Sequence, residues 1–286
     1  MSQYQNLLDI LTLEQLNELT FKGLTIDIGS PQVYGGQVLS QSLQSAAYTV
    51  PEDRHLHSLH GYFLSPGRID QEIIYEVERL KDGRSFNTRR VKARQGDRDI
   101  FIMACSYHKE EDGFTHYAPM PNVAQADSLS SFPEIFANLA EKLQIKPRGI
   151  YAEDSSIIFH PVEHYDPFNP HVRPAKSHVW FKVNGDLPIN LRFRQSLLAY
   201  ASDFNLLKTS LYPHAVSLFT SPMRIASLDH AMWFHRPVVE DDWMLYVVDS
   251  PNAHGALAYC TGSIYSRKGE LLCSVSQEGL IRKLIA

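Results

Sequence analysis

The pattern of hydrophobic and polar positions along the chain repeats in its two halves. In the first half, residues 37–50 (QVLSQSLQSAAYTV) place apolar side chains at helical spacing, and Pro51 ends the pattern. Serines keep the other faces of this helix thin, which suits a helix that neighbours approach closely from several sides. Segments rich in β-branched and aromatic residues follow, and turn residues separate them. They are 56–64, 73–80, 85–94 and 100–108.

The second half shows the same order of elements. A helix is predicted over 191–203, and the strands that follow are predicted over 224–235, 243–250, 255–266 and 270–279. A shift of about 170 residues aligns the two halves. It places Ser58-Leu59 on Ser227-Leu228 and Ile100–Ser106 on Leu271–Gln277.

A helix followed by an antiparallel run of strands is half of a sheet-wrapped helix. Two such halves can close into one continuous sheet that holds two helices, so the pattern predicts an α+β protein. We expect an N-terminal unit over 1–110, a linker over 111–155 and a C-terminal unit over 156–286. The linker is irregular and proline-rich around one short helix.

Charge and composition narrow the function classes. With 27 basic against 32 acidic residues the net charge is −5, which argues against nucleic acid as the main partner. No apolar run approaches the roughly 20 residues of a membrane helix, so we expect no membrane insertion. The N-terminus lacks the basic region of a signal peptide. Cys105, Cys260 and Cys273 lie unclustered in apolar stretches, which indicates buried, reduced thiols and a cytoplasmic protein.

Six segments carry a specific resemblance when they are taken together, in order and over nearly the whole chain. They are YGGQ (34–37), HSLHGYFLSPG (57–67), DGRSFNTRRV (82–91), YASDFNLL (200–207), LDHAMWFHRP (228–237) and SVSQEGLIR (274–282). In these segments the chain resembles the acyl-CoA thioesterase II (TesB-type) family. The resemblance implies a double hotdog protomer, hydrolysis of medium- to long-chain fatty acyl-CoA to the free acid and CoA, no cofactor, and a homo-oligomer such as a dimer or tetramer.

The resemblance also implies three catalytic residues in the C-terminal half. They are Asp203 in YASDFNLL, Ser227 in the segment before DHAMWFHRP, and Gln277 in SVSQEG. Many bacterial relatives carry threonine where this chain has Ser227, and serine keeps the hydroxyl. A carboxylate can accept the proton of a water molecule, while a hydroxyl and an amide hold that water or donate toward the developing oxyanion.

Local sequence alone leaves other interpretations of these residues open. Asp203 either caps a second helix that follows it or sits at the C-terminus of the first, where a carboxylate is electrostatically misplaced. Regular alternation puts Ser227 on one face of its strand with Ile225 and Asp229, and His230 on the opposite face. Gln277 shares a face with Val275 and Gly279, and an inward amide there is compatible with a structural role.

Further candidates are weaker. His57 is the best reserve acid or base, and Arg89 and Arg90 are candidates to meet the CoA phosphates, although a solvated strand edge explains them equally well. The histidines at 55, 57 and 60 do not share a strand face and no metal-binding motif accompanies them, so we expect no metal site. Asp229, His230 and His235 suit a structural or pocket-lining role.

Two rival functions remain. A hotdog enoyl-CoA hydratase carries Asp-x-Asn-x-x-His, and this chain follows that pattern through Asp203 and Asn205 but has Lys208 in place of the histidine. A non-catalytic acyl-CoA binding protein is the alternative outside enzymes. In the first half, His57-Ser58 and Ser106 occupy the places of Ala226-Ser227 and Gln277, which shows how such a site can be lost. No GxSxG, GxGxxG or P-loop motif appears, which counts against an α/β-hydrolase, a dinucleotide enzyme and an NTPase.

Overall fold

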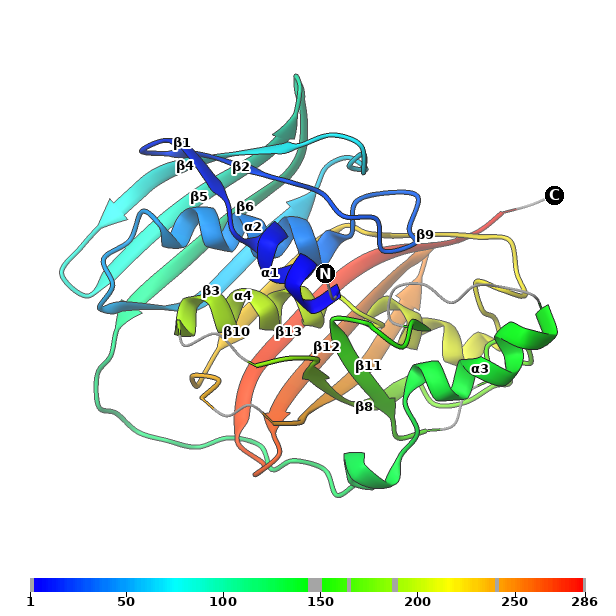
Figure 1. Ribbon diagram of the computed structural model, residues 1–286. Coiled ribbons are helices and arrows are strands. Elements are labelled where there is room, and N and C mark those ends of the chain that lie inside the picture. The colour runs from blue at the N-terminus through cyan, green and yellow to red at the C-terminus, as the bar shows by residue number, and fades with distance from the viewer. Residues whose placement is uncertain (1–2, 144–150, 164–165, 187–189, 240–241, 285–286) are drawn as a thin grey trace.

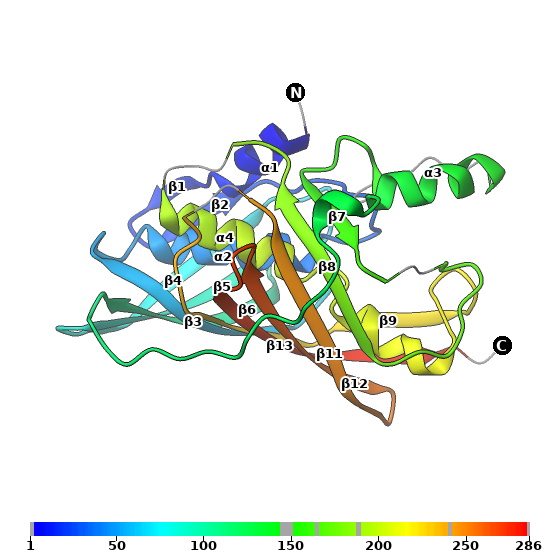
Figure 2. The same cartoon turned by 90° about the horizontal axis from the view of Figure 1, so that it is seen from below.

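The computed structural model describes residues 3–143, 151–163, 166–186, 190–239 and 242–284. In these residues, one sheet of thirteen strands curves around two helices, α2 (Gly35–Ala47) and α4 (Leu191–Ser202) (Figure 1). Both helices lie on the same face of the sheet and pack against each other (Figure 2). Two helices held by one continuous sheet confirm the predicted α+β class and the double hotdog arrangement.

The first half supplies α1, α2 and one side of the sheet, in the strand order β1-β2-β4-β5-β6-β3. The bounds of the elements not yet given are α1 Gln3–Leu11, β1 Glu14–Asn17, β2 Thr20–Gly23, β3 Arg54–Phe63, β4 Ile73–Asp82, β5 Phe86–Gln95 and β6 Arg98–Lys109.

The second half continues the sheet in the order β10-β13-β12-β11-β8-β7, and β9 also pairs with β13. These strands are β7 Ile157–Pro161, β8 Lys176–Val183, β9 Met223–Ser227, β10 Asp229–Phe234, β11 Met244–His254, β12 Leu257–Ser266 and β13 Leu271–Lys283. The antiparallel pairing of β3 with β10 joins the two halves into one sheet.

Between β6 and β7 the chain runs along the edge of the molecule to a short 3-10 helix, η1 (Ala126–Ser128), and to α3 (Phe132–Leu143) (Figure 1). A second 3-10 helix, η3 (Leu207–His214), follows α4. The unit limits at 110 and 155 stay a prediction.

The thin serine faces of α2 serve the close packing that the sequence indicates. Every residue from Gly36 to Ala47 is buried. The Ser40 hydroxyl oxygen lies 2.7 Å from two carbonyl oxygens, one on Gly36 in its own helix and one on Ser196 in α4. A larger side chain at Ser40 would separate the two helices.

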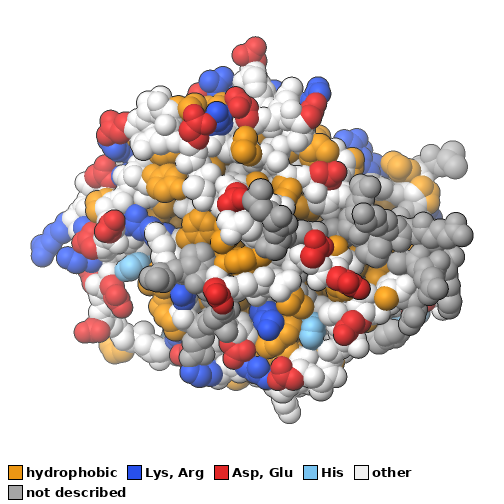
Figure 3. Space-filling view, viewed as in Figure 1, with side chains coloured by type: hydrophobic (Ala, Val, Ile, Leu, Met, Phe, Trp, Pro, Cys, Tyr) orange, Lys and Arg blue, Asp and Glu red, His pale blue; other side chains and the backbone are white. Residues whose placement is uncertain are grey.

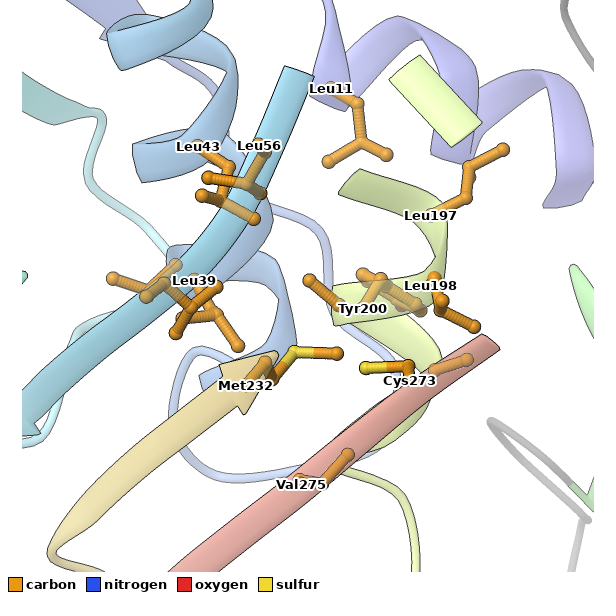
Figure 4. Close-up of a cluster of buried hydrophobic side chains, with 14 of the residues drawn as sticks. Leu11, Leu39, Leu43, Leu56, Leu197, Leu198, Tyr200, Met232, Cys273 and Val275 are labelled. Atoms are coloured by element: carbon orange, nitrogen blue, oxygen red, sulfur yellow. The ribbon is translucent and has the colours of Figure 1, made fainter. Parts of the chain in front are cut away.

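Both units share one hydrophobic core. Leu39 and Leu43 of α2 and Leu197 and Leu198 of α4 meet residues of β10 and β13 in a single buried cluster (Figure 4). The three cysteines are buried and form no disulfide, as predicted. None of the described helices has the length and apolar character needed to span a bilayer.

Two expectations for the elements were wrong or incomplete. The single strand predicted over 224–235 is two strands, β9 and β10, which part at Leu228. The apolar pattern also gave no element for the first 34 residues or for 156–190, where the structure has α1, β1, β2, β7 and β8. The helices and remaining strands lie within a few residues of their predicted positions.

Candidate active site

Asp203 lies at the C-terminus of α4, where it is the C-cap residue. Its carboxylate faces the N-terminus of α2, and Gly36 N–H donates a hydrogen bond of 2.9 Å to Oδ2. The next helical segment, η3, has Leu206 as its N-cap and no side-chain cap. The capping alternative is therefore wrong. The carboxylate is misplaced for its own helix but well placed for the positive end of α2.

Ser227 and Gln277 come to the same point from two strands. Ser227 is the last residue of β9, and Gln277 lies in the middle of β13. The Gln277 amide Nε2 donates a 2.7 Å hydrogen bond to the Ser227 hydroxyl. Both side chains also hydrogen-bond with Asp203, and these bonds act to lower the pKa of its carboxyl. The three residues thus converge, as the resemblance implies.

A one-residue bulge between β9 and β10 explains how the side chains share a face. Ser227 pairs with Gly279 on β13, whereas Ala231 pairs with Ser276. Between these pairs, residues 228–230 face only residues 277–278 of β13, so one extra residue interrupts the alternation. The bulge turns Ser227 and His230 to the same face of the sheet. The prediction that His230 lies on the face opposite Ser227 was therefore wrong.

His230 is the residue of the site that the sequence interpretation missed. It is fully buried, and its Nδ1 lies 2.5 Å from Gln277 Oε1. Its Nε2 lies 3.0 Å from the hydroxyl of Ser202, the residue before Asp203. Burial lowers the pKa of the imidazole, and the nearby Asp203 charge opposes that effect. The sequence could have indicated this role only if the bulge had been known, and the bulge depends on how the strands pair.

Burial is the main influence on the Asp203 carboxyl and raises its pKa above the ordinary value. The charge of His230, the Gly36 N–H and the hydrogen bonds from Gln277 and Ser227 act in the opposite direction. A carboxylate with a raised pKa holds a proton more strongly than a surface aspartate does. That property suits a group that takes a proton from water near neutral pH.

Asp203, Ser227 and Gln277 lie on the wall of a pocket of about 330 Å³. Most of its remaining lining is apolar and comes from η3 and the segments around it, including Leu206, Leu211, Leu218, Phe219 and Ile225.

A second pocket, of about 400 Å³, shares Ile225 and Ser227 with the first. Its other lining residues include Tyr34, Gly35, Phe63 and the exposed Arg224. Ser227 therefore stands where a mostly apolar compartment meets a second one that has an arginine in its lining.

The three candidate substrate-binding residues lie elsewhere. His57 lines a different pocket with His55 and His108, and its ring contacts Phe86. Arg89 is buried, where it donates hydrogen bonds to the Asp82 carboxylate, the Thr49 hydroxyl and three backbone carbonyls. Arg90 is exposed and pairs with Glu78. Substrate binding by these residues stays a prediction, and the buried contacts of Arg89 give that side chain a structural role.

In the part of the chain that the structure describes, no group of three or more His, Cys, Asp or Glu side chains could hold a metal ion. On the face shown in Figure 3, acidic and basic side chains are interspersed, without a continuous basic surface.

Comparisons with known proteins show which family the chain is similar to. A family model described as acyl-CoA thioesterase matches residues 152–280, and one described as the acyl-CoA thioesterase N-terminal domain matches residues 26–108. Acyl-CoA thioesterase 2 of Haemophilus influenzae is 39% identical over 277 residues, 97% of each chain. Human acyl-coenzyme A thioesterase 8 is 33% identical over 281 residues, 96% of this chain and 88% of the relative.

Solved structures show the same similarity. The crystal structure of an acyl-CoA thioesterase II, TesB2, from Mycobacterium marinum has a TM-score of 0.79 and 34% identity, and the match covers 97% of this chain and 98% of that one. A hotdog-fold protein from Alicyclobacillus acidocaldarius also has a TM-score of 0.79, at 15% identity over 98% of this chain and 99% of that one. The second similarity concerns the fold alone.

Proposed function

The chain belongs to the acyl-CoA thioesterase II (TesB-type) family, and we propose that it hydrolyses medium- to long-chain fatty acyl-CoA through a water activated by Asp203, Ser227 and Gln277. The observation that carries the proposal is the convergence of these side chains on one pocket wall. The chemistry needs no cofactor, because a thioester is already activated toward attack.

In the mechanism, Asp203 accepts a proton from the water while the water oxygen attacks the thioester carbonyl. The Ser227 hydroxyl and the Gln277 amide hold the water or donate toward the oxyanion that forms. The tetrahedral intermediate collapses with cleavage of the C–S bond. The proton held by Asp203 passes to the leaving CoA sulfur, which gives the free acid and the CoA thiol.

We assign the two compartments to the two ends of the substrate. The pocket of leucines and Phe219 suits an acyl chain, because burial of methylene groups against apolar side chains is favourable by about 0.8 kcal/mol each. The second pocket, with Arg224 in its lining, suits the pantetheine arm and the charged end of CoA. Ser227 lies at their junction, where the thioester would sit.

The test measures thiol release over a chain-length series of acyl-CoA substrates. We expect Asp203→Ala to lose most turnover without unfolding, and Ser227→Ala and Gln277→Ala each to lose on the order of 10²-fold in kcat. Ser227→Thr keeps the hydroxyl and should stay active. Ser58→Ala is the matched control, because Ser58 occupies the position of Ser227 in the first half, and it should leave kcat unchanged.

Specific outcomes would contradict the proposal. A Ser227→Ala enzyme at full rate would remove that residue from the site. Uncatalysed thiol release together with ligand-induced thermal stabilisation would favour an acyl-CoA binding protein. Loss of enoyl absorbance with crotonyl-CoA, without thiol release, would favour a hydratase, despite Lys208 in place of its histidine.

We also propose a homo-oligomer, a dimer or tetramer, in the cytoplasm. The outer face of the sheet supports assembly, because Tyr62, Ile102 and Trp233 are exposed there on neighbouring strands. The three unpaired thiols support a reducing compartment. Light scattering with size-exclusion chromatography checks the assembly: a monomer at micromolar concentration would contradict it.

A further inference from the structure

We propose that His230 is a positioning residue that fixes the orientation of the Gln277 amide and, through it, the proton-donating side of the active site. The inference rests on the proposed function, because it concerns the same catalytic amide. His230 lies on β10 directly across from Gln277 on β13, since Ala231 pairs with Ser276 in the antiparallel register. Both side chains are buried on the helix-facing side of the sheet.

The hydrogen bonds around Gln277 determine where the protons lie. Gln277 Nε2 donates to Ser227, so Oε1 is left to accept. The atom 2.5 Å from Oε1 is His230 Nδ1, which must therefore carry a proton. Burial favours the neutral imidazole, and its other nitrogen, Nε2, then accepts from the hydroxyl of Ser202 at 3.0 Å.

Ser202 fixes this chain of hydrogen bonds to the helix that carries Asp203. It is the last residue of α4, it is fully buried, and its hydroxyl also lies 2.8 Å from the Ala199 carbonyl oxygen. If the Ser202 proton goes to that carbonyl instead, His230 Nε2 must donate and the imidazole is charged. In both states Nδ1 keeps its proton, so the amide orientation is the same.

The orientation matters because a glutamine amide has one accepting and one donating end. While His230 Nδ1–H donates to Gln277 Oε1, the Gln277 NH₂ group points to Ser227 and the pocket. Without that donor, the amide can rotate and present Oε1 to Ser227. The Ser227 hydroxyl would then donate to Gln277 instead of to Asp203 or the water, and the site would lose donors for the oxyanion.

Two polar substitutions separate positioning from packing. In His230→Asn the amide nitrogen is bonded to Cγ, as Nδ1 is, so a donor to Gln277 is kept. In His230→Gln the amide lies one bond further out, near the place of Nε2, so it reaches Ser202 and not Gln277. We expect His230→Asn to keep kcat within about threefold and His230→Gln to lose at least about tenfold, with KM little changed, the scale of an outer hydrogen-bond partner.

A double substitution tests the route of the effect. If His230 acts through Gln277, the Gln277→Ala/His230→Gln enzyme has the same kcat as Gln277→Ala alone. The matched control is His235→Leu, which should leave kcat unchanged. It breaks a 2.9 Å imidazole–hydroxyl bond from the residue after the end of β10 to Ser274 on β13. Thermal melts of each variant establish that it is folded.

The outcomes distinguish this proposal from the proposed function. A slow Gln277→Ala enzyme beside a His230→Gln enzyme at full rate overturns the positioning role alone. Equal losses in the Asn and Gln variants, in proportion to lost Tm, also overturn it. A Gln277→Ala enzyme at full rate removes Gln277 from catalysis, and the role of His230 falls with it.

Discussion

At the scale of single residues, the position of Asp203 is unfavourable for stability and suits its proposed function. Its carboxylate is buried, which costs solvation and raises its pKa, and it lies at the C-terminus of its own helix, where the helix dipole disfavours a negative charge. The donors around it, Gly36 N–H, Ser227 and Gln277, offset part of that penalty. The rest of the penalty comes from the charge itself, because a neutral side chain of the same shape would still accept the hydrogen bond from Gly36 N–H.

Asp203→Asn should therefore be inactive yet more stable than the wild type near neutral pH. The folded-state pKa of Asp203 lies above that of the unfolded chain, so the native state binds the proton more tightly. Wild-type stability then falls as the pH rises through the raised pKa, and the variant escapes this loss. We expect a Tm increase on the order of 3 °C at pH 8 that shrinks toward pH 5. Melts across this pH range measure it, and a variant less stable than wild type at pH 8 would show that attraction between the charge and the N-terminus of α2 outweighs the cost of burying the charge.

The cysteines give a second prediction at this scale. Burial raises the pKa of Cys105 to about 12 and that of Cys260 to about 11, and it also raises that of Cys273. The reactive thiolate is therefore scarce and inaccessible. We expect no rapid reaction of native protein with Ellman's reagent at pH 8, and three thiols per chain after denaturation. Fast labelling of even one thiol in the native protein would contradict this expectation.

The sequence predicted some residues of the site and not others for a physical reason. Asp203, Ser227 and Gln277 were identified through the resemblance to a family, since each alone fits a bland structural role. His230 was placed on the wrong face because alternation was assumed across Leu228. A bulge is a property of two paired strands, and a pattern along one strand does not contain it.

At the scale of elements, α2 and α4 stabilise each other through charges placed at their ends. Arg192, near the start of α4, donates to carbonyls at and beyond the end of α2, among them Ala47 and Val50. Asp203, at the end of α4, accepts from Gly36 near the start of α2. Both charges are misplaced for α4 and favourable for the dipole of α2. The two helices are thus linked at both ends, and Asp203, the proposed catalytic carboxylate, forms one of the two links.

Arg192→Leu should destabilise the fold by about 2–4 kcal/mol, because four carbonyl oxygens near the end of α2 lose a charged donor. Urea unfolding followed by fluorescence measures the free energy. Arg68→Leu is the control, since Arg68 is exposed and its ion pair with Asp70 is screened by solvent, so its loss should change stability little. Similar losses in the two variants would mean that Arg192 contributes no more than a surface charge.

The sequence indicated long elements with a strong apolar period more reliably than short ones. The helices α2 and α4 and the long strands carry enough repeated positions for the period to be seen. The strands β1 and β2 have four residues each, and β1 is exposed throughout, so it leaves no alternation to detect. Tertiary pairing, and not local pattern, defines these edges of the sheet.

At the scale of the whole molecule, the proposed active site contains groups from both halves. Asp203, Ser227 and Gln277 come from the second half, but the N–H that holds Asp203 comes from α2 of the first. Tyr34 of the first half also donates a hydrogen bond to the Tyr200 carbonyl, one helical turn before Asp203. The pairing of β3 with β10 and the contact of α2 with α4 fix this relationship. The duplication visible in the sequence therefore produced one site from two units.

This shared site predicts the behaviour of a chain cut between its halves. Residues 110–125 contain no helix or strand, and an added side chain at Gly113 meets nothing within 4 Å. A protease site inserted after Gly113 should be cut readily, since exposed loops are preferred sites of nicking. We expect the two pieces to elute together and to keep most of kcat, because the sheet and the helix pair hold them. A piece of 114–286 expressed alone should be inactive, since it lacks Gly36. Pieces that separate without denaturant, or an active second piece, would show that the first half does not hold Asp203 in place for catalysis.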